Sequence, residues 1–184
     1  FKNESLLKFS ELWVEFAEQF GDSIICSPMP SSVTMPESMF SHLLEQAVGT
    51  TEQKQKIAAT HKKIRSWFLA GLEHSDFTEL VSFSLPETFP ETTILPNPRD
   101  LLGGASILYS RTDYCEHLVL IVTLLKKYER FSFIIHTKDS IEGFQFAVKE
   151  ESGVIVAKND CSIIFVFRRQ SMTRAFQNYL DDII

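Results

Sequence analysis

The sequence predicts an α+β fold: an N-terminal helical segment followed by an antiparallel sheet of four to five strands flanked by helices. Two patterns support this. Apolar residues recur every three to four positions in the first part of the chain, as on the buried side of a helix. In the last third, short apolar runs alternate with turn residues, as in hairpin-connected strands. With 184 residues, 44% of them hydrophobic, the chain can bury a sizeable core.

The N-terminal part is expected to be helical. An aromatic-rich apolar stripe predicts a helix over residues 4–20, which serves either as core packing or as a docking face for a partner. A second helix is expected over residues 37–48 and a third from Thr51 onward. The short Gly49–Thr50 link predicts that these two helices form an antiparallel hairpin.

Proline marks the border between the two parts. Four of the seven prolines lie within residues 84–104, which predicts a long irregular crossing there. We therefore expect a helical segment over 1–95 and an α+β sheet domain over 96–184, with one compact unit as the alternative.

The second part is more strongly patterned. A short strand over 105–109 leads to Ser110, which with Asp113 forms the pattern of a helix-capping box. The helix that follows is expected to reach Glu129 and to bury one face made of Leu118, Ile121, Val122 and Leu125. Four strands and a last helix complete the prediction, over 131–137, 143–150, 154–158, 162–167 and from Gln170.

Composition narrows the functional classes. The net charge of −6 and the lack of a basic stripe argue against direct nucleic-acid contact. The three cysteines, Cys26, Cys115 and Cys161, are widely spaced, which favours a reducing, cytoplasmic location over a disulfide framework. No apolar run reaches the length of a membrane span, about 18 residues. Because the chain begins at Phe1, we expect it to be a piece of a longer protein.

Catalytic and metal motifs are weak. Cys115 and His117 are two residues apart on a predicted helix, so their side chains point to different faces. His42 and Glu45 have the i, i+3 spacing of metal ligands but lack a second such pair. The Gly103–Gly104 pair lacks the helix, Lys and Ser or Thr of a phosphate loop. We therefore predict no catalytic residue, metal or cofactor, with a small cysteine or metal enzyme as the least favoured interpretation.

The aromatic residues of the second part suggest a ligand site. Binding pockets are mostly apolar and aromatic, with a few polar groups. The predicted lining comes from neighbouring strands, and two arginines beside it suit a carboxylate or phosphate: Phe133, Phe144, Phe146, Phe165, Arg168 and Arg169. The alternative is a packed core with a basic rim.

Residues 130–184 resemble the C-terminal regulatory region of certain bacterial helix-turn-helix transcriptional regulators. The similarity lies in the segments 131–136, 145–158, 162–167 and 172–180. It implies sensing and dimerisation here, with DNA binding in a separate domain. The sequence thus predicts a non-enzymatic regulatory domain of a larger protein that senses a small-molecule effector and forms a homodimer. The alternative is a protein–protein interaction or dimerisation module without such a ligand, using the helix over 4–20.

Overall fold

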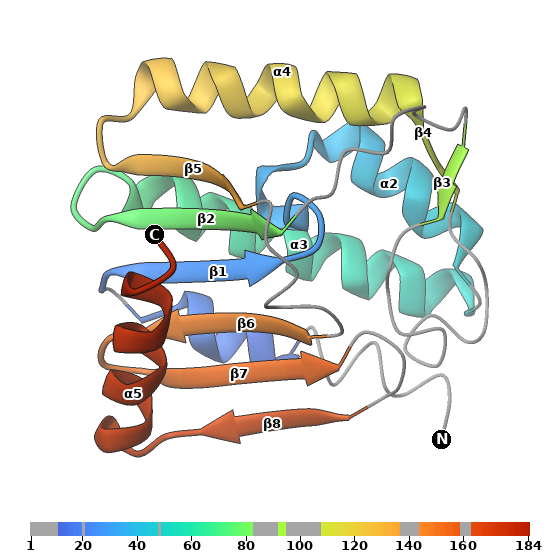
Figure 1. Ribbon diagram of the computed structural model, residues 1–184. Coiled ribbons are helices and arrows are strands. Elements are labelled where there is room, and N and C mark those ends of the chain that lie inside the picture. Colours follow the sequence, from blue (N-terminus) through green and yellow to red (C-terminus); the bar gives the residue numbers. More distant parts are fainter. Residues whose placement is uncertain are drawn as a thin grey trace.

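A mixed six-stranded sheet forms the centre of the computed structural model (Figure 1). The structure describes residues 11–19, 21–47, 49–82, 92–94, 108–136, 144–158 and 163–184. The strands follow the spatial order β5-β2-β1-β6-β7-β8. Their bounds are β1 Ser23–Ser27, β2 Phe77–Ser82, β5 Phe131–His136, β6 Phe144–Lys149, β7 Gly153–Lys158 and β8 Ile164–Phe167.

The sheet is only half antiparallel, which corrects the expected all-antiparallel arrangement. β5, β2 and β1 run parallel, whereas β6, β7 and β8 continue from β1 in antiparallel pairs. The predicted four strands of the second part are all present. The turn at Glu151-Ser152-Gly153 joins β6 to β7, and Gly153 has a φ of 115°. A Cβ on Gly153 would lie 2.1 Å from the carbonyl oxygen of Phe167, so both its conformation and its close contact require glycine.

The segment over 1–95, expected to be helical, also supplies strands, because β1 and β2 come from it and pair with strands from beyond residue 95. Both strands are covered on two faces, so they lack the alternating pattern that marks a half-exposed strand. β1 is a short run, Ser-Ile-Ile-Cys-Ser, and β2 carries the charged Glu79 among apolar residues. Neither segment shows the alternation of apolar and polar residues by which the sequence analysis recognised hairpin strands.

The helices mostly follow the prediction. α2 spans Glu37–Gln46 and α3 spans Thr51–Gly71, beginning at a capping box of Thr50 and Gln53. α4 spans Arg111–Lys127 with the predicted box of Ser110 and Asp113, and α5 spans Gln170–Asp181. Of the helix expected over 4–20, residues 11–17 are helical, while 4–10 and Phe20 lie outside the described residues.

Two short elements precede α4 in the described chain. β3, Thr92–Ile94, pairs antiparallel with β4, Leu108–Ser110, in a separate two-stranded sheet. Of the predicted strand over 105–109, residues 108–109 belong to β4, and 105–107 lie outside the described residues. Most of the proline-rich crossing, the Gly103–Gly104 pair and Cys161 lie outside the described residues.

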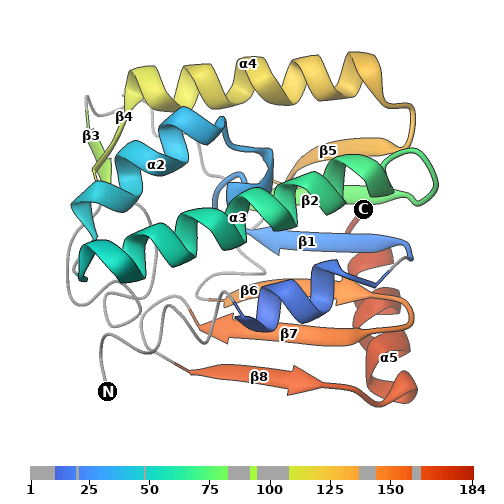
Figure 2. The same ribbon diagram turned by 180° about the vertical axis from the view of Figure 1, so that it is seen from behind.

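Helices cover both faces of the sheet. Figure 2 shows the helix of residues 11–17 and α3 across one face with α4 along its edge, whereas α5 lies on the face seen in Figure 1. On the first face, α3 and α4 bury a core with the sheet that includes Phe68, Leu72, Ile121, Leu124 and Phe131. On the second face, α5 places Leu180 against Cys26, Leu80, Val148 and Val154. Among the described residues, no helix is both long and apolar enough for a membrane span.

The buried face of α4 differs from the predicted one. Tyr114, His117, Ile121 and Leu124 are its buried residues, and Leu118 is partly buried. Val122 and Leu125, which were expected inside, are 47% and 40% exposed. The stretch from Leu118 to Leu125 is apolar around most of the helix, so its periodicity leaves the inner face undefined.

Candidate functional site

The four phenylalanines predicted to line one cavity lie on opposite faces of the sheet. Phe144 and Phe146 pack with the α5 side of the core. Phe165 shares their face, because it pairs with Val156, which in turn pairs with Phe146. Phe133 packs against the α3 and α4 side instead. Successive residues of a strand point to opposite faces, and the registers of β5 and β6 place Phe133 out of phase with the others.

On the α5 side the aromatic rings fill the space between them. Phe176 of α5 lies 5.6 Å from Phe146 and 5.9 Å from Phe167, measured between ring centroids. Phe144 stacks on Phe146 and Phe165 stacks on Phe167, each at 6.2 Å. These separations are those of packed aromatic pairs. Phe144, Phe146, Phe165, Phe167 and Phe176 therefore pack between α5 and the sheet.

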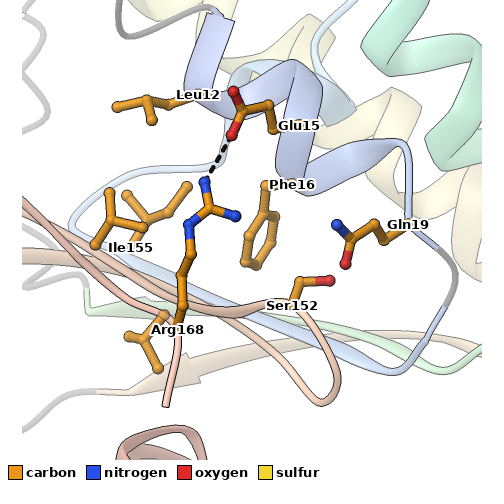
Figure 3. A pocket seen from close by; sticks show the side chains of 9 residues that line it. Leu12, Glu15, Phe16, Gln19, Ser152, Ile155 and Arg168 are labelled. Atoms are coloured by element: carbon orange, nitrogen blue, oxygen red, sulfur yellow. Dashed lines mark hydrogen bonds and ion pairs between the residues drawn. The ribbon is translucent and has the colours of Figure 1, made fainter. Parts of the chain in front are cut away.

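The two predicted arginines also lie apart from this aromatic cluster. Arg168 is exposed and donates to Glu15 at 2.6 Å, as Figure 3 shows, on the side of the sheet that carries helix 11–17. The pocket beside it has a volume of about 10 Å³, which is close to the minimum for one water molecule. Arg169 is exposed at the N-cap of α5, where its carbonyl accepts from Thr173. The structure does not bring these arginines to the phenylalanines.

A buried cluster of ionisable side chains lies between the sheet and α4. Glu79 of β2 and His117 of α4 are both fully buried. The Thr34 hydroxyl lies 3.1 Å from Oε2 of Glu79 and 3.0 Å from Nε2 of His117. The backbone N–H of Ser31 donates to the other carboxyl oxygen of Glu79. The loop that follows β1 thus supplies the groups that satisfy both ionisable residues.

Burial shifts both groups toward their neutral forms. Desolvation raises the pKa of Glu79 to about 7, although hydrogen bonds from Ser31 and Thr34 oppose the shift. Desolvation, helped by the positive charge of Arg65, lowers the pKa of His117 to about 4. At neutral pH His117 is uncharged and Glu79 is close to its midpoint.

A second histidine fixes the same loop from α3. His61 lies 2.7 Å from the carbonyl oxygen of Ser32 and stacks on Phe40 with ring centroids 3.5 Å apart. Desolvation lowers the pKa of His61 below its usual value. Both histidines therefore contact the short 3₁₀ turn Ser32–Thr34.

The cluster was missed although one signal was present. Glu79 stands in an apolar strand, Phe-Thr-Glu-Leu-Val-Ser, in phase with Phe77 and Val81. A carboxylate on the core side of a strand is rare unless it has hydrogen-bond partners. β2 was not predicted from the sequence. Without that strand, Glu79 could not be recognised as a carboxylate that faces the core.

The structure does not bring together the candidate catalytic or metal-binding residues of the sequence. Cys115 is exposed while His117 is buried, so the two point away from each other as predicted. The described residues contain no group of three or more His, Cys, Asp or Glu side chains able to hold a metal ion. His42 and Glu45 are both exposed on α2.

The outer side of α4 carries the exposed apolar side chains. Val119 is 67% exposed, and Val122 and Leu125 lie beside it at three-residue spacing. Cys115, one turn before Val119, is also exposed. In Figures 1 and 2 α4 lies along one edge of the sheet, and no described helix or strand lies beyond it. We call Cys115, Val119, Val122 and Leu125 the α4 stripe.

Comparison of the chain with protein families, with curated proteins and with solved structures finds no match. The resemblance to transcriptional regulators therefore stays a hypothesis.

Proposed function

We propose that this chain is a non-enzymatic regulatory domain of a larger protein that acts through protein contact at the α4 stripe. The exposure of the α4 stripe carries the proposal. Val119, Val122 and Leu125 form a continuous apolar line on a helix whose other side is anchored in the core. Apolar side chains gathered on one surface are typical of interaction sites, whereas single exposed ones are common everywhere.

This proposal follows the interaction-module alternative but moves its surface from the N-terminal helix to α4. In the described part of that helix Phe16 is buried and Trp13 packs against it edge-on at 5.7 Å. Its aromatic side chains thus support the core. The exposed apolar side chains of α4, in contrast, contribute little to the core of the described chain, and a partner could cover them.

Effector sensing has less support. The aromatic rings of the α5 side pack against one another, and the pocket beside Arg168 has room for about one water. Membership in a cytoplasmic transcriptional regulator, with DNA contact made by another domain, is compatible with the net charge of −6. The contact proposal does not depend on it.

Protection of Cys115 from a maleimide reagent in the producing cells tests the proposal. The chain would carry Cys161→Ser, and Cys26 is buried with its pKa raised to about 12, which keeps that thiol unreactive. A cysteine introduced by Glu151→Cys, in the exposed β6–β7 turn, is the reference. Peptide mass spectrometry reports both labelling rates.

We expect Cys115 to react more slowly than the reference in cells and about equally fast in the dilute purified chain. Val119→Asp should remove the protection in cells. If Cys115 were labelled as fast as the reference inside cells, the α4 stripe would be free there and the proposed function would be wrong.

A further inference from the structure

Two exposed charges of opposite sign flank the three apolar residues of the α4 stripe, Val119, Val122 and Leu125. Glu116 precedes Val119 by three residues, and Lys126 follows Val122 by four. Both side chains are exposed, and no ion pair joins either to another described residue. At the ends of the helix, Arg111 begins the first turn and Glu129 follows the last one, and both are exposed.

Two antiparallel copies of α4 place opposite charges near each other, because Glu116 of one copy then lies near Lys126 of the other. If a second copy of α4 is turned end for end with Val119 opposite Val122 of that copy, Glu116 lies within about one residue, roughly 1.5 Å along the axis, of Lys126 of the second copy. The same arrangement brings Arg111 to the end where both Glu129 and Arg130 of the second copy lie, so the helix ends favour neither direction. In this register the apolar contact and the Glu116–Lys126 pairing therefore occur together.

A parallel pairing lacks this match. It would set Glu116 against Glu116 and Lys126 against Lys126, and like charges at close range are unfavourable. It would also align the two helix dipoles, whereas the antiparallel pairing opposes them. A two-fold axis across α4 thus allows the two stripes to pack together and Glu116 of each copy to pair with Lys126 of the other.

We propose that the partner at the α4 stripe is a second copy of this chain, paired antiparallel through α4 across a two-fold axis. The inference rests on the proposed function, because it names the partner of the same surface. Three apolar side chains per copy make a small contact, so the association is weak and concentration-dependent.

Sedimentation equilibrium of the full chain tests the pairing by charge reversal. Glu116→Lys alone and Lys126→Glu alone each place like charges across both halves of the symmetric contact. We expect each to raise the dimer dissociation constant at least about fivefold, since exposed ion pairs are modest and two are lost per dimer. The double variant Glu116→Lys/Lys126→Glu restores opposite charges and should return to within about twofold of wild type.

Two controls separate charge from folding. Glu151→Lys makes the same charge change in the β6–β7 turn and should leave the dissociation constant unchanged. Val119→Asp should give a monomer with a wild-type circular dichroism spectrum, because its side chain makes no core contact.

Two results would overturn the pairing. A wild-type chain that is monomeric at every concentration would exclude a second copy as the partner. If Cys115 is nevertheless protected in cells, the proposed contact function holds, but with a different partner. A dimer in which the double variant is as weak as the single ones excludes the antiparallel register.

Discussion

The hydroxyl group of Thr34 connects Glu79 of β2 with His117 of α4, at 3.1 Å and 3.0 Å respectively. This contact ties the sheet, the loop after β1 and the inner side of α4 into one buried polar cluster. The cluster fixes the position of α4, and the outer side of that helix carries the stripe. The contacts of the inner cluster therefore help to determine which side of α4, and so which apolar residues, face outward.

Removing the connecting hydroxyl should destabilise the fold. In Thr34→Val both Glu79 and His117 lose a buried partner, and an unsatisfied buried polar group costs about 1–3 kcal/mol. Thr34→Ser keeps the hydroxyl and should cost clearly less. Urea denaturation of the three proteins measures the difference. A Val variant as stable as wild type would show that the hydroxyl contributes nothing.

The pH dependence of stability should show two opposing contributions. Glu79 has a pKa raised from 4.5 to about 7, so its stabilising contribution is complete below pH 4.5 and is lost as pH rises toward 7. His117 has a pKa lowered from 6.5 to about 4, so its contribution is complete above pH 6.5 and is lost as pH falls toward 4. Each shift corresponds to about 3 kcal/mol.

Single substitutions should unmask these two contributions. Glu79→Gln leaves the histidine, so its free energy of unfolding should fall as the pH is lowered through 6.5. His117→Gln leaves the glutamate, so its free energy of unfolding should fall as the pH is raised from 4.5 to 7. Denaturant titrations at several pH values, with wild type as the flatter reference, check both slopes. Parallel curves for all three proteins would contradict the assignment.

The two sides of α4 should respond differently to truncation. Ile121 is 1% exposed, so Ile121→Ala should cost about 2–5 kcal/mol. Val122→Ala removes a half-exposed side chain from the next position and should change the stability of the monomer by less than about 1 kcal/mol. Thermal unfolding at low protein concentration compares them. Equal losses for the two variants would mean that the helix is rotated relative to this structure.

The aromatic cluster should behave as core rather than as a ligand site. Phe146 is packed by Phe176, so Phe146→Ala should cost about 3 kcal/mol, near the lower end of the range for buried phenylalanine. Phe165 is 48% exposed at the edge of the sheet, and its truncation should cost far less. If Phe146→Ala left stability unchanged, the rings would not be holding α5 to the sheet.

Local signals in the sequence predicted the local structure well. Ser110 and Asp113 form the capping box expected from their spacing, and the hairpin strands of the last third lie within a few residues of their predicted bounds. Caps and tight turns depend on residues close in sequence, so a single chain is enough to recognise them.

The pairing of strands that are far apart in the sequence could not be predicted from such local signals. β1 pairs with β2 and β6 across roughly fifty and more than a hundred residues, and nothing local to Ile24 or Ile25 specifies either partner. The inner side of α4 is set by His117, whose burial depends on Thr34 and Glu79 from elsewhere. The phenylalanines of the predicted ligand site are divided between two faces for the same reason, because the facing of Phe133 depends on a strand register.

The most direct test of the α4 contact is the unfolding midpoint measured as a function of protein concentration. Association of native chains alone stabilises them by mass action. The account predicts a midpoint that rises with concentration for wild type, and a constant midpoint for Val119→Asp that equals the wild-type value at high dilution. A constant wild-type midpoint, or a Val119→Asp midpoint lowered at every concentration, would contradict it.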